Sequence, residues 1–247
     1  MRIGVLPLFF FSAALAQQRP DAAEVLRRIN DAYTNVTRYQ LAGEAKIVTA
    51  AASDGAITDQ STHKFLIALQ EPDMVHVEMT PGDPDEEAIY VISDGKDGWA
   101  YSPKRNEYMK VKPGRAPATT LGDLDFTPEM TVSYAIQMAQ QALQAFKFGP
   151  AVQASVVGDE TLTIGGTAFD CVAISIEGRP FPKSTAKLWI DKARSVVLRE
   201  DSRTPAGNVT ESISTVYSTV RLNESLPVEL FKFVPPPGAK LVDRIGR

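Results

Sequence analysis

Cysteine is almost absent from this sequence of 247 residues, in which Cys171 is the only one. A single cysteine excludes a disulfide within one chain. Cys171 lies in a largely apolar, strand-like run, and no histidine is near it in the sequence. A reactive thiol needs a neighbour that stabilises its charge. We therefore interpret Cys171 as a small buried core residue.

Histidine is also scarce, with only His63 and His76. The two could meet across neighbouring strands, but a zinc site needs further ligands that the chain does not supply, so we expect no metal and no cofactor. The acidic run from Asp83 to Glu87 lacks the ligand spacing of a calcium loop and is interpreted as a solvated turn. A Gly-x-Ser-x-Gly motif and a glycine-rich phosphate loop are missing too. These absences favour a protein that is not an enzyme.

An excess of basic residues is lacking as well. The chain has 26 Lys and Arg against 30 Asp and Glu, whereas nucleic-acid binding requires a basic surface that displaces counterions. Nucleic acid is therefore excluded as a partner. With 44% hydrophobic residues, the chain can bury a core, either as one large β domain or as two small ones.

No apolar run reaches the roughly 20 residues that cross a bilayer. The N-terminal run from Ile3 to Leu15 follows the single charge of Arg2 and leads into Ala14-Leu15-Ala16, the small-residue pattern that a signal peptidase requires. We expect residues 1–16 to be a signal peptide cleaved after Ala16, and residues 17–247 to form a single domain. This domain should be a soluble periplasmic monomer. An uncleaved membrane anchor is the alternative.

Two segments have the three- and four-residue spacing of amphipathic helices. The first begins at Pro20 and Asp21, and the second runs from Thr127 and Pro128 to Gly149. Their apolar faces are Val25, Leu26, Ile29, Ala32, Tyr33 and Val36 in the first helix, and Val132, Ala135, Ile136, Ala139, Leu143 and Phe146 in the second. Residues 112–126 have no period and are expected to form a long mobile loop.

Most of the remaining chain alternates between apolar and polar residues, which indicates strands separated by turn residues. Expected strands before the second helix are 39–47, 65–69, 75–79, 89–92, 99–101 and 107–112; those after it are 155–157 with 161–164, 168–177, 187–191, 195–199 and 209–222. Pro235 to Gly238 should end all regular structure. The order is helix, about six strands, helix, about five strands. Two helices cannot cover both faces of so many strands, so the sheet must close on itself or curl around a concave side, as a packed barrel or a ligand holder.

Three segments resemble the outer-membrane lipoprotein carrier superfamily, the LolA/LolB-like proteins. Ile92 to Lys96 with Trp99 to Pro103 resembles its "DGK, W, Y, P" hairpin, and Leu188 to Asp191 resembles its "LWID" strand. Phe231 to Phe233, followed by Pro235 to Gly238, resembles its closing "F-x-F, PP-x-G" signature. The resemblance implies a mainly β (α+β) fold. This would be a strongly curved antiparallel half-barrel of about 11 strands, with helices covering the concave side.

The resemblance also implies a cavity for acyl chains. By position, its ligand-binding wall would consist of Tyr39, Leu41, Ile47, Phe65, Ile67, Leu69, Val75 and Val77 on three strands, with Ala135, Ile136 and Ala139 on a helical lid. In the true carriers an Arg-Pro pair latches the lid, but this chain has Glu71-Pro72, and a carboxylate cannot reproduce the donor geometry of a guanidinium. If Glu71 is a latch, its partner would be a backbone N–H or a basic residue, for which Lys110, Lys112 and Arg115 are the nearest candidates.

The resemblance favours a periplasmic carrier of a lipid or lipidated protein. The alternative is an envelope-stress regulator of the same fold, which would bind an envelope membrane protein of the anti-sigma-factor type. A carrier predicts an apolar cavity, a regulator predicts a protein partner, and an enzyme would need polar groups that converge in the cavity.

Overall fold

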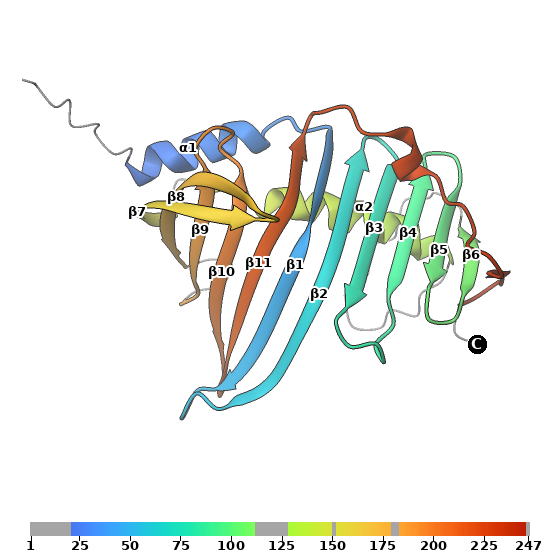
Figure 1. Ribbon diagram of the computed structural model, residues 1–247, viewed down its shortest axis with the longest axis horizontal. Coiled ribbons are helices and arrows are strands. Elements are labelled where there is room, and N and C mark those ends of the chain that lie inside the picture. Colours follow the sequence, from blue (N-terminus) through green and yellow to red (C-terminus); the bar gives the residue numbers. More distant parts are fainter. Residues whose placement is uncertain (1–20, 112–127, 150–151, 179–182, 246–247) are drawn as a thin grey trace, which may run out of the picture.

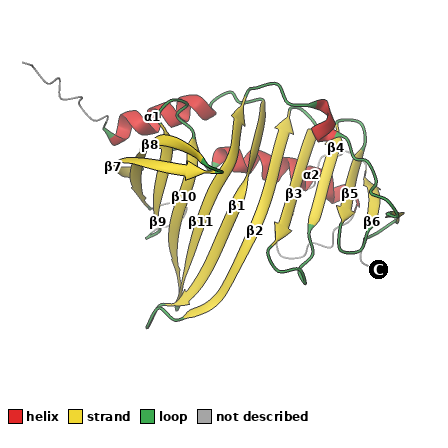
Figure 2. Cartoon of the chain, viewed as in Figure 1, coloured by secondary structure: helices red, strands yellow, loops and turns green. Residues whose placement is uncertain are grey.

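The computed structural model describes residues 21–111, 128–149, 152–178 and 183–245. The signal segment, the expected loop over 112–126, and two of the suggested partners of Glu71, Lys112 and Arg115, lie outside the described residues. The described chain contains two α-helices, one short 3-10 helix and twelve strands in a single curved open sheet (Figure 2).

Both expected helices are present. Helix α1 (Ala22–Tyr33) begins where the sequence predicts, because the Asp21 side chain accepts a hydrogen bond from the Glu24 amide at 2.7 Å. Helix α2 (Pro128–Gln144) ends before the expected Gly149. The Phe146 amide bonds to the Leu143 carbonyl three residues back, which tightens and ends the last turn.

The strands before α2 and those after it form two meanders, which join where the first strand of the sequence pairs with the eleventh. The strands are β1 (Arg38–Ala51), β2 (Ile57–Gln70), β3 (Met74–Pro81), β4 (Ile89–Asp94), β5 (Gly98–Ser102), β6 (Glu107–Val111), β7 (Gln153–Ile164), β8 (Thr167–Glu177), β9 (Thr185–Asp191), β10 (Val197–Ala206), β11 (Val209–Leu222) and β12 (Lys240–Leu241). Their order in the sheet is β12-β6-β5-β4-β3-β2-β1-β11-β10-β9-β8-β7. Every pair is antiparallel except β12 with β6.

Two expectations about the strands were wrong. Residues 155–157 and 161–164 belong to one strand, β7, which keeps its pairing with β8 across a bulge between Val156 and Gly158. The proline run does not end regular structure, because Lys240 donates to the Asn106 carbonyl and starts β12 beside β6. Before the prolines, Val228–Phe231 forms the 3-10 helix η1.

The sheet has two faces that are covered by different parts of the chain. We call the face that carries Tyr39, Leu69 and Val75 the helix face, because α2 contacts β2 to β6 on this side (Figure 1). We call the opposite face, which carries Ala68 and His76, the tail face. The C-terminal segment, residues 224–245, passes over this face and joins the sheet edge at β12. Neither helix in the described residues has the length and apolar character that crossing a bilayer requires.

The two histidines do not meet. His63 pairs with Ala45 and shares the helix face with Phe65, whereas His76 pairs with Ala68 and lies on the tail face. Because alternate residues of a strand point to opposite faces, the suggested contact between the histidines is wrong.

Candidate ligand-binding site

The residues expected to form the cavity wall do share one face of the sheet. Tyr39 pairs with Leu69, which pairs with Val75, and in the next row Leu41 pairs with Ile67, which pairs with Val77. The remaining two, Ile47 and Phe65, lie further along the same face of β1 and β2. The period of two in the sequence thus predicted the sidedness of all three strands.

The inner part of this wall is closed core. Tyr39, Leu41, Leu69, Val75 and Val77 are between 0 and 4% exposed. In the expected lid, Ala135 and Ala139 are 1% and 0% exposed, and the Tyr39 hydroxyl donates to the Ala139 carbonyl at 2.5 Å. These residues therefore pack against α2, and a ligand would reach them only if α2 moved.

The outer part of the wall is only half covered. Ile47, Phe65, Ile67 and Ile136 are all partly exposed. The long strands β1, β2, β10 and β11 extend well past the helices (Figure 1). The Tyr217 ring lies at 5.7 Å from both Phe65 and Phe146, and so joins the half-covered strands to the end of α2.

Three cavities lie at the β7 to β9 end of the sheet, and Phe146 of this aromatic group borders the first of them. The first, of about 160 Å³, is lined by Ala145, Phe146, Phe148, Ile176, Ala186, Leu188 and Glu200. The second, of about 370 Å³, is lined by Ala22, Ala23, Leu26, Arg27, Asn30, Phe148, Gly149, Val152 and Ala154. The third, of about 640 Å³, is lined by Val152, Gln153, Glu177, Gly178, Lys183, Ser184 and Thr185. Phe148 borders the first two and Val152 the last two, so the cavities adjoin one another.

The first cavity is apolar apart from Glu200. Burial, followed by the charge of Glu200, holds the pKa of Tyr217 well above its usual value, so the phenol stays neutral. In the second cavity, the Asn30 amide donates to the Phe148 carbonyl and its oxygen accepts from the Phe148 amide, both at 2.8 Å. This pair fixes the chain just past α2 against α1.

The sequence did not predict these cavities as the site. Phe146 and Leu188 were recognised as part of a helix face and a strand, but they are 42 positions apart and meet only in the folded chain. The one local signal was the apolar spacing of Phe146 and Phe148, which continues past the helix end.

Glu71 lies exposed at the turn after β2, and its amide donates to the Thr37 carbonyl. The suggested partner Lys110 instead places its Nζ 2.8 Å from Asp97 Oδ1. That pairing was therefore wrong, because Lys110 lies on β6 next to the β4-β5 turn.

Cys171 is buried in the core, as the sequence predicted. Burial, followed by the charges of Asp191 and Asp170, raises the pKa of its thiol to about 11. The thiol is therefore protonated near neutral pH.

A family model described as "Predicted periplasmic protein (DUF2092)" matches residues 22–244. Among curated proteins, an uncharacterized protein of Methanocaldococcus jannaschii is 21% identical over 235 residues, which cover 94% of this chain and 56% of that protein. The chain thus spans little more than half the length of this relative.

Solved structures show distant similarity. An uncharacterized conserved protein from Thermus thermophilus is 15% identical at a TM-score of 0.38, over 90% of this chain and 98% of that one. The Pseudomonas aeruginosa MucA/MucB complex contains a chain that is 12% identical at a TM-score of 0.38. The match covers 86% of this chain and 60% of that one. A LolA superfamily protein from Nitrosomonas europaea is 13% identical at a TM-score of 0.27. The match covers 87% of this chain and 99% of that one.

Proposed function

This chain belongs to the DUF2092 family, whose description is "Predicted periplasmic protein", and on that premise we propose that it is a non-enzymatic periplasmic binding protein for a hydrophobic ligand. The ligand would be a lipid or the acyl chains of a lipidated protein. The signal peptide would be removed on export by cleavage after Ala16, which the small residues at Ala14 and Ala16 favour.

The observation that carries this proposal is the run of adjoining cavities around Phe148 and Val152. The second cavity, about 370 Å³, falls within the range of about 300 to 1,000 Å³ that is typical of small-molecule sites. The third, about 640 Å³, is also in this range, but most of its lining residues are polar. The first provides aromatic and aliphatic walls with one carboxylate. Such a lining favours apolar cargo over reactive chemistry.

The ligand would lie on the helix face, which we infer to be the concave side of a half-barrel with α2 as its lid. An acyl chain could enter at the cavities and extend over the half-covered residues Ile47 and Phe65. A 16-carbon chain gains on the order of 12 kcal/mol at about 0.8 kcal/mol per methylene, whereas association costs about 4 to 15 kcal/mol. Two or three chains would therefore bind more securely than one.

Cavity filling tests this function. The Ala186→Phe variant places a ring in the first cavity, and Arg203→Phe is its control because Arg203 lies exposed on the other face of neighbouring β10. We expect the parent protein to bind an environment-sensitive dye that fatty acid or phospholipid displaces. Ala186→Phe should bind at least about tenfold more weakly, a loss of about 1.4 kcal/mol, while the control binds as the parent does.

A second filling variant guards against misfolding. Ala145→Phe enters the same cavity from an exposed position just past α2, so the fold should tolerate it. A parent protein that binds no dye, or filled variants that are folded and still bind normally, would rule out this site.

A further inference from the structure

The ring of His76 joins the sheet to the C-terminal segment. Its Nδ1 lies 2.5 Å from the Leu230 carbonyl oxygen in η1, and its Nε2 lies 2.7 Å from Glu78 Oε1 on the same strand. The residue is 8% exposed. Both ring nitrogens are therefore used in short polar contacts at a largely dry position.

Both partners of the ring are acceptors. A backbone carbonyl has no proton to donate, and an ionised carboxylate has none either. A neutral imidazole carries one N–H, so it can satisfy only one of these partners, whereas an imidazolium donates to both. The geometry thus fits the protonated ring, and loss of its proton would leave one nitrogen lone pair facing an oxygen.

The segment that His76 holds has a modest contact area of its own. Leu226, Leu230 and Phe231 pack on Ala68 and its neighbours, and Phe233 contacts the ring of Trp99 at 6.0 Å. Beyond the prolines, β12 adds two residues to the edge of β6. Phe233 also contacts the rings of Tyr101 and Tyr108, and Val242 donates to the Tyr108 carbonyl. These contacts hold the later part of the segment, so the histidine acts mainly on η1, where its partner Leu230 lies.

Other charged and titratable groups lie on the tail face of the neighbouring strands or in and beside η1. Glu78 lies on β3 itself, and Lys64 lies on β2. Tyr90 and Asp94 lie on β4. Glu229 lies in η1 and Lys232 directly after it. Glu78 is the one whose side chain contacts the ring of His76. Asp94 instead accepts from the amides of Lys96 and Asp97 in its own turn.

We propose that His76 is a proton-dependent clamp that holds the C-terminal segment on the tail face. The protonated ring donates to both oxygens, whereas a neutral ring keeps only one of these two hydrogen bonds, so the clamp is weakened when the ring loses its proton. The clamp is independent of the proposed ligand site on the other face.

Amide hydrogen exchange of the full chain tests the clamp. After correction for the intrinsic pH dependence, we expect peptides covering residues 226–242 to exchange about three- to tenfold faster at about pH 8 than at about pH 5.5, as the loss of one net hydrogen bond implies. The chain offers a matched control, since His63 is the only other histidine and lies on the helix face near Ser61.

Two variants separate the clamp from a general effect of pH. In His76→Gln, the amide can donate to the Leu230 carbonyl at any pH, so the corrected exchange should not depend on pH, whereas His63→Gln should behave as the parent does. In Glu78→Gln, the amide can donate to a neutral ring, so the segment should stay held at the higher pH. A pH-independent parent, or a His76→Gln variant that keeps the parent's response, overturns the proposal.

Discussion

The two ends of the single sheet are covered in different ways. At the β2 to β6 end, α2 covers one face and the C-terminal segment covers part of the other. At the β7 to β9 end, α1 leaves cavities on the helix face. The hydrogen-bonded ladder is continuous between them. Backbone pairing therefore does not decide where the protein can accept a ligand; the covering segments do.

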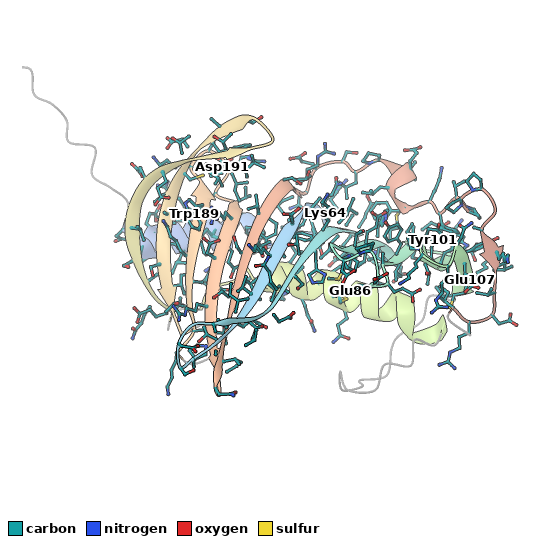
Figure 3. The ribbon with its side chains drawn as sticks, turned by 60° about the horizontal axis from the view of Figure 1, so that its bottom comes forward. Lys64, Glu86, Tyr101, Glu107, Trp189 and Asp191 are labelled. Atoms are coloured by element: carbon teal, nitrogen blue, oxygen red, sulfur yellow. The ribbon has the colours of Figure 1, made fainter. Side chains whose placement is uncertain are left out.

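The two tryptophans show the same contrast on the tail face. Trp99 stacks on Phe233 of the C-terminal segment. Trp189 has cations over its ring instead, with Lys187 Nζ at 4.3 Å and the Arg199 guanidinium at 4.6 Å from its centroid. Figure 3 shows Trp189 and Tyr101 far apart toward opposite ends of the sheet. The Trp99 ring is thus covered by the C-terminal segment, whereas the Trp189 ring is covered by charged side chains that remain near water.

The largest expected effect comes from truncating one side chain in each environment. Leu69→Ala removes a side chain that is 1% exposed beneath α2, whereas Ile47→Ala removes one that is only partly buried on the same face. We expect Leu69→Ala to lower the free energy of unfolding by about 2 to 5 kcal/mol, and Ile47→Ala by clearly less. Urea unfolding measures both; equal losses would contradict the contrast between closed and half-covered wall.

A smaller loss of unfolding free energy is expected when the hydrogen bond from Tyr39 to α2 is removed. Tyr39→Phe removes the hydroxyl that donates to the Ala139 carbonyl, and the net loss should be about 0.5 to 1.5 kcal/mol. If α2 is a lid, the dye should also dissociate faster from Tyr39→Phe than from the parent in a stopped-flow displacement. The control is Tyr108→Phe, a partly buried tyrosine beside Phe233 on the tail face. Equal dissociation rates in the two variants would show that α2 does not gate the site.

The sequence predicted those parts of the fold that depend on local patterns. Asp21 caps α1 as expected, and the alternation from Tyr39 to Ile47 placed these residues on one face. The Ser93 to Gly95 turn between β4 and β5 was expected as well. Each of these features is decided within a few residues of chain, where periodicity and turn chemistry apply.

Features that depend on distant partners were not predicted. The first half of β2, residues 57–64, is polar and shows little alternation, yet it forms a strand because the outer half of β1 pairs with it, Ile47 opposite Ser61. Likewise, β12 follows a proline run and exists because the Asn106 carbonyl accepts from Lys240. The cavities need Phe148, Ile176 and Leu188 together, and no local pattern relates them.

The smallest loss of unfolding free energy is expected from changes to the charged side chains that surround Trp189. Glu160 accepts from Lys187 Nζ at 2.7 Å and from Trp189 Nε1 at 2.6 Å, and hydrogen bonds from Lys187 and then Trp189 lower the pKa of this carboxyl. Because the pair is partly exposed and screened, Glu160→Gln should cost only about 0.2 to 1 kcal/mol at neutral pH. At the other end of the sheet, Glu87→Gln is the matched variant, since the hydrogen bond from Ser102 and then that from Arg105 lower the pKa of Glu87.

The pH dependence of these two variants has a defined sign. A carboxyl whose pKa is lowered on folding contributes stability above its unfolded pKa of about 4.3, and this contribution is lost as the pH falls through the folded pKa. In urea unfolding, Glu160→Gln and Glu87→Gln should have a slightly lower free energy of unfolding than the parent protein. This difference should shrink as the pH is lowered below about 4.3. If Glu160→Gln instead cost as much as Leu69→Ala, the charged groups over Trp189 would stabilise the sheet as effectively as α2 does. The β7 to β9 end could then no longer be regarded as the less covered end, because a strong polar cover would replace the missing apolar one.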